Sequence, residues 1–90
     1  MAEEATASEL AAQALIFIAQ DLDRTGRFLA LSGIGPMDIR DRSQEPAFQA
    51  GILDYLLTDE ALLVEFAQWA DVEPSSVAKN RRYLPGAAPI

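Results

Sequence analysis

Apolar residues recur along this chain at the spacing of α-helices. Leu10, Ala14, Phe17 and Ile18 stand at positions i, i+4, i+7 and i+8, which places them on one side of a helix. The short run around Phe17 would also suit a strand, but the alanines that surround it and the length of the pattern favour a helix. The pattern therefore predicts a first helix over residues 7–20.

Capping residues and prolines predict five further helices. Asp and Thr side chains accept hydrogen bonds at helix N-termini, Pro is favoured in the first turn, and Gly suits the left-handed residue that ends a helix. These signals mark a second helix from Asp21 or Asp23 to Gly33, a third from Pro36, a fourth from Pro46, a fifth from Thr58 or Asp59, and a sixth from Pro74. No segment alternates strictly between apolar and polar residues. The predicted fold class is all-α, a compact bundle of about six short helices.

The chain resembles itself when it is shifted by 38 residues. Helix caps, a turn proline and apolar positions then coincide, which is the signature of an internal repeat. The identical pairs are Ala12 and Ala50, Leu15 and Leu53, Asp21 and Asp59, Phe28 and Phe66, and Pro36 and Pro74. We therefore predict two three-helix units, 8–42 and 46–84, that are related by an approximate twofold and bury each other's apolar faces. Unrelated helices that merely share caps and leucines are the alternative.

The ends of the chain lack the pattern. We expect a flexible N-terminus over 1–7, a single helical domain over 8–84 and a flexible tail over 85–90. The first residues are acidic, the reverse of a secretory signal, and the longest apolar run, 14–19, falls far short of the ~20 residues that span a bilayer. These features indicate a cytoplasmic protein without a membrane partner.

Composition restricts the chemistry. The 90 residues include no Cys and no His, so thiol nucleophiles, imidazole bases and the usual zinc ligands are excluded. Asp21, Asp23 and Thr25 match the opening of a calcium loop, but the twelfth position, which needs a bidentate Glu, is Ser32. We therefore expect no enzymatic activity, no cofactor and no metal.

Charge separates two classes of partner. The net charge is −7, with six acids and no base in residues 46–73, so nucleic acid is an unfavoured partner. Residues 74–90 are the exception, since they hold Lys79, Arg81 and Arg82 and no acid. The spacing of Ala67, Asp71, Val72 and Val77, repeated in the first unit, resembles a helix-turn-helix. A DNA-binding protein that uses its last helix is therefore the alternative function.

Several apolar residues lie outside the main apolar stripes of their helices. Exposed together, they would form a patch suited to a protein partner or to self-association, although a core larger than the helical wheels imply would also account for them. A lone acid on the apolar fourth helix marks either its solvent side or an ion pair with Arg24 or Arg27. These candidate interface residues are Ile16, Asp54, Leu57, Leu63 and Val64. They make a non-catalytic protein–protein interaction module our preferred function.

Several short strings are similar to those of a known family. They are Gly26–Leu29, Gly33 with Pro36, Pro46–Phe48, Leu53–Leu57, and Asp59 with Glu60. Over residues 8–86 the chain resembles a family of small bacterial proteins known only as a domain of unknown function. The resemblance implies a small cytoplasmic helical protein, and it supplies no activity, cofactor or catalytic residue.

Overall fold

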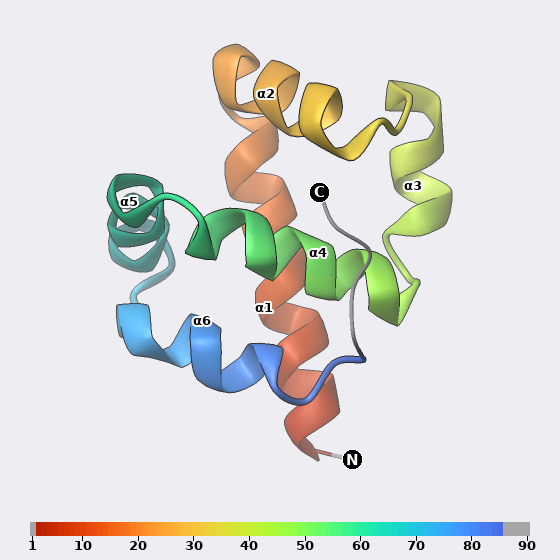
Figure 1. The fold of residues 1–90 in the computed structure, drawn as a ribbon. Helices are drawn as coiled ribbons and strands as arrows, with labels where there is room; N and C mark the ends of the chain where they lie inside the picture. The colour runs from red at the N-terminus through yellow and green to blue at the C-terminus, as the bar shows by residue number, and fades with distance from the viewer. Residues whose placement is uncertain (1, 86–90) are drawn as a thin grey trace.

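Helices account for most of residues 2–85, the part of the chain that the computed structural model describes. This part contains no strand, which confirms the all-α prediction. The elements are α1 (Ala2–Ala19), α2 (Leu22–Ser32), the 3-10 helix η1 (Pro36–Asp38), α3 (Ile39–Arg42), α4 (Pro46–Leu57), α5 (Glu60–Ala70) and α6 (Pro74–Arg81) (Figure 1). None of the helices in this part is long and apolar enough to cross a bilayer.

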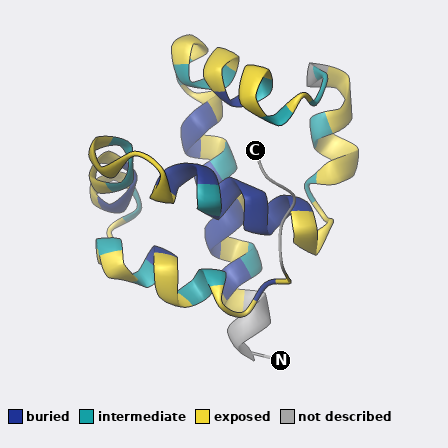
Figure 2. Ribbon diagram, viewed as in Figure 1, coloured by how far each residue is buried: buried dark blue, intermediate teal, exposed yellow. Residues whose placement is uncertain are grey.

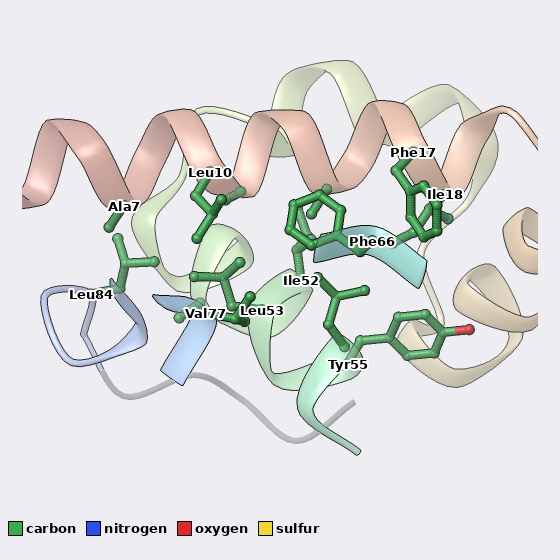
Figure 3. Packing of buried hydrophobic residues seen from close by; sticks show 14 of the residues in the cluster. Ala7, Leu10, Phe17, Ile18, Ile52, Leu53, Tyr55, Phe66, Val77 and Leu84 are labelled. Atoms are coloured by element: carbon green, nitrogen blue, oxygen red, sulfur yellow. The ribbon is translucent and has the colours of Figure 1, made fainter. Parts of the chain in front are cut away.

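The first helix is longer than the apolar pattern predicts. It begins at Ala2 instead of near residue 7, so the predicted start of this helix is wrong, while the flexibility expected over 1–7 stays a prediction. Ala and Glu occupy residues 2–5, and both favour helix, with acids additionally stabilised near a helix N-terminus. Ala7 is fully buried near Leu84, which follows α6 (Figure 3). Of the tail predicted over 85–90, only Pro85 lies among the described residues.

Helix α4 occupies the centre of the molecule and is its most buried element (Figure 2). It packs most extensively against α1, and α6 lies across both. Side chains from these three helices and from α5 point toward one another in a single apolar cluster (Figure 3). Two aromatic groups extend the cluster toward α2 and α5. Phe28 meets Tyr55 edge-on with ring centroids 5.3 Å apart, and Phe17 meets Phe66 in the same way at 5.5 Å.

The local features of the repeat coincide in the two halves. Helices α2 and α5 have bounds that differ by 38 residues at both ends. Asp21 caps α2 and Asp59 caps α5, each through its carboxylate. Both helices end in a left-handed residue, Gly33 with φ 71° and Asp71 with φ 57°. The twofold relation of the two units in space stays a prediction, and one difference between the units is described below.

The two left-handed positions provide a matched prediction. A positive φ is sterically unfavourable for an L-residue, and an acid at a helix C-terminus also interacts unfavourably with the helix dipole. We expect Asp71→Gly to raise the free energy of unfolding by roughly 0.5–1 kcal/mol and Gly33→Ala to lower it by about 1 kcal/mol. Urea denaturation measures both changes. Asp71→Asn, which removes only the charge, separates the dipole effect from the backbone effect; equal gains from Asn and Gly would contradict the backbone explanation.

Candidate interaction surfaces

Ile16 lies on α1 beside a groove that the sequence did not reveal. Its side chain is 54% exposed and lines two adjoining hollows, of about 360 Å³ and about 280 Å³. Leu15 is the other residue that both hollows share. We call this pair of hollows the α1 groove. Its remaining walls come from other residues of α1, among them Ala12, and from α2, α3, α4 and the turn after α3, with Thr25, Phe28, Ile39, Ser43, Gln44, Gln49 and Ile52.

Gln49 is a buried polar residue that joins three elements beside this groove. Its side-chain oxygen accepts a hydrogen bond from the Ser8 hydroxyl at 2.8 Å, and its amide group donates to the backbone oxygen of Ser43 at 3.0 Å. The link ties α1 to α4 and to the end of α3. A Gln on an otherwise apolar helix carries no clear signal for such a role, because its burial depends on where α1 and α3 pack.

Asp54 forms an ion pair with a residue that the sequence analysis did not consider for it. The Arg81 Nε donates to the Asp54 Oδ1 at 2.8 Å, whereas Arg24 and Arg27 were the expected partners. Arg24 instead pairs with Glu65 at 2.8 Å and lies 4.1 Å from the Phe17 ring centroid. Helix α6 packs against α4 and brings Arg81 to Asp54, a contact between residues 27 positions apart that no local pattern encodes.

Leu57, Leu63 and Val64 lie where α4 turns into α5. Leu57 and Val64 are 36% and 38% exposed, while Leu63 is partly buried against the core. Glu60 and Val64 stand at i and i+4, so they share one side of α5, and Asp71 is the residue that ends this helix. We use the name α5 face for six exposed residues that lie on α5 or within three residues of its ends, namely Leu57, Asp59, Glu60, Val64, Asp71 and Glu73. Ile16, beside the α1 groove, belongs to a different set of elements.

The α5 face carries negative charge that the protein leaves largely uncompensated. Its four carboxylates, at 59, 60, 71 and 73, are exposed, and within residues 2–85 none of them forms an ion pair. Asp59 uses one oxygen to cap α5. Behind this face, burial raises the pKa of Tyr55 above its ordinary value of 10.0, an effect that Arg27 opposes and Asp59 strengthens. The Tyr55 phenol therefore stays neutral at physiological pH and adds no charge.

The three basic residues proposed to contact nucleic acid are not equally available for binding. Besides pairing with Asp54, the Arg81 guanidinium donates to the backbone oxygens of Leu84 and Pro85, at 3.2 and 3.1 Å. Lys79 and Arg82 are exposed. One of the three candidate phosphate contacts is thus engaged inside the protein, which weakens the DNA-binding alternative.

The calcium-like motif at Asp21 and the aromatic side chain of Trp69 both have structural roles within the fold. Asp21, the start of the calcium-like motif, caps α2 through the backbone amides of Asp23 and Arg24. Within residues 2–85, no three side chains of metal-binding type come together. Trp69 is 43% exposed and packs one side against Phe17 and Phe66.

Comparison with known sequences agrees with the resemblance seen in the sequence. The family described as "Protein of unknown function (DUF3572)" matches residues 4–87. Neither a curated protein nor a solved structure gives a significant match. The resemblance to a domain of unknown function is therefore confirmed, and it extends over almost the whole chain.

Proposed function

We propose that this chain, which belongs to the DUF3572 family of proteins of unknown function, is a non-catalytic module for protein–protein interaction. The surface that best supports this role is the α5 face. Its occupant is a cationic segment of another protein that presents an aliphatic side chain between basic residues.

One observation supports the proposal above the others. Leu57 and Val64 expose aliphatic surface among the carboxylates of Asp59, Glu60 and Asp71, and residues 46–73 contain no Lys or Arg to neutralise them. Apolar contact supplies affinity once water is excluded, and a complementary charge steers the encounter and sets its register. A basic, aliphatic partner satisfies both features, whereas an acidic or uncharged one satisfies at most one.

The non-catalytic part of the proposal rests on the residue types present. The chain has neither His nor Cys, so proton transfer near neutral pH would require a carboxyl or amino group with a shifted pKa. The carboxylates of the α5 face are exposed on the protein surface, where a cationic partner can reach them.

A direct test uses a short helical peptide with leucines on one side and lysines on the other. We expect wild-type protein to bind it, and the variant Glu60→Lys with Asp71→Lys to bind about tenfold more weakly, since two attractive contacts become repulsive. Val64→Ser, which leaves the charge unchanged, is expected to weaken binding about fivefold through lost apolar contact. Fluorescence anisotropy of the labelled peptide measures each affinity.

The matched control reverses two acids outside the α5 face, Asp38→Lys with Asp41→Lys. Each double reversal adds four positive charges to a net charge of −7, so both variants carry −3. Equal weakening by the two variants would show that only overall charge attracts the peptide and would contradict the α5 face as the site. Titration with duplex DNA tests the alternative: tight binding that falls steeply with salt would favour the nucleic-acid function instead.

A further inference from the structure

The third helix of the first unit and that of the second unit pack differently against the rest of the protein. Under the shift of 38 residues, α6 corresponds to residues 36–43, which form η1, α3 and the residue that follows. Val77 of α6 is fully buried in the core, whereas its counterpart Ile39 is only partly buried and lines the α1 groove. Helix α6 packs against α1, α4 and α5, while α3 packs closely only with η1. The third helix of the second unit is packed into the core, which we call seated, whereas the third helix of the first unit is packed only loosely.

An ion pair is one of the contacts of the seated helix, in addition to the buried side chain of Val77. Asp54 on α4 holds Arg81 at the end of α6, at 2.8 Å. The corresponding positions of the first unit are Ile16 and Ser43, which cannot form an ion pair. Both of these residues line the same hollow of about 360 Å³. The first unit therefore has a hollow at the positions where the second unit has the ion pair of Asp54 and Arg81, which we call the latch.

The attachments of α3 are few and lie mainly at its ends. The Gln49 amide holds the backbone oxygen of Ser43 at 3.0 Å, and Gly33, in the left-handed conformation, begins the turn that leads to η1. Between these points, Ile39 lines the hollow of about 280 Å³ together with the apolar side chains of Ile18 and Phe28. Closure of this space would remove apolar surface from water, which would offset part of the free-energy cost of moving α3.

From this contrast we propose that α3 is a movable strap over the α1 groove, with a second, closed position against α1 that corresponds to the seat of α6. In the closed position Ile39 and Ile16 are buried and the groove is shut; in the position seen in this structure the groove is open. The proposal is independent of the α5 face, because it concerns different elements.

Because the chain contains no cysteine, a thiol-reactive dye reports on an introduced thiol alone. A single thiol is introduced by Ile39→Cys, and a buried reference by Val77→Cys at the corresponding position. In native protein, a thiol-reactive dye is expected to label residue 39 about 100-fold or more faster than residue 77, which is reached only by large-scale opening. Equal, slow labelling at both positions would overturn the proposal, because α3 would then be as firmly seated as α6.

The closed position is tested by transferring the latch. Ile16→Asp with Ser43→Arg recreates the pair formed by Asp54 and Arg81, and is expected to slow labelling of the thiol at 39 by about fivefold. The backbone oxygen of Ser43, which Gln49 holds, is retained in this variant. The like-charged control, Ile16→Asp with Ser43→Glu, is expected not to slow labelling.

Two results decide this second step. Slower labelling in the latched variant alone supports the strap, whereas unchanged or faster labelling in the latched variant overturns it. Circular dichroism establishes that each variant is folded. If the latched variant does not fold, equal and slow labelling of the thiols at 39 and 77 in the otherwise unchanged chain would still overturn the proposal.

Discussion

Replacement of Phe66 by Ala is expected to lower the free energy of unfolding by about 3–5 kcal/mol, because it leaves a cavity in the centre of the core. Phe66 is fully buried and packs edge-on against Phe17, with ring centroids 5.5 Å apart. The free energy of unfolding of a native domain is only about 5–15 kcal/mol, so the variant should be only marginally stable. Urea denaturation followed by far-ultraviolet circular dichroism measures the change.

The repeat supplies the matched comparison. Phe28 stands 38 residues before Phe66, is equally buried, and packs against Phe48 and Tyr55. Phe28→Ala should therefore cost a similar amount, and the milder Phe66→Leu should cost roughly 1–2 kcal/mol if the alanine variant does not fold. A loss below about 1 kcal/mol for Phe66→Ala would show that the ring does not lie in a close-packed core, contrary to this fold.

Local chemistry explains which parts of the fold could be predicted. Asp21, Asp59, Pro46 and Pro74 act within one turn of their own helix, so their positions marked element boundaries to within a residue or two. The left-handed conformation of Asp71 was not predicted, because Asp does not mark such a turn as Gly33 does at the corresponding position of the first unit. Helix α1 was underestimated since its first turns are rich in Ala and Glu, which favour helix without producing an apolar stripe.

The candidate surfaces depend on packing and were less accessible to prediction. Whether Ile16 joins the core is decided by where α2 and α3 cross α1, and it lies beside a groove because α3 stands off. The partner of Asp54 was misassigned because Arg81 approaches it from another helix. The negative charge of the α5 face was foreseeable, since residues 46–73 contain no base and any exposed helix in this segment must be acidic.

The difference between the two units follows from a few substitutions at corresponding positions. Asp54 and Arg81 form an ion pair between α4 and α6, whereas the corresponding residues Ile16 and Ser43 cannot form one. Both units contribute to the core, whose central helices are α1 and α4, and the first unit in addition carries the groove beside α3.

The central pair of helices provides the last prediction. Small residues lie in the buried region of α1 and α4, where Ala11, Ala14 and Ala50 have no exposed surface and Gly51 is also buried. Ala14→Leu adds three carbons where no space exists, so we expect it to lower the free energy of unfolding by about 2–3 kcal/mol. Ala12→Leu, on the exposed side of the same helix, is expected to change it by no more than about 0.5 kcal/mol. Denaturation of both variants in urea measures the difference, and equal effects at 12 and 14 would mean that α1 does not pack closely against α4.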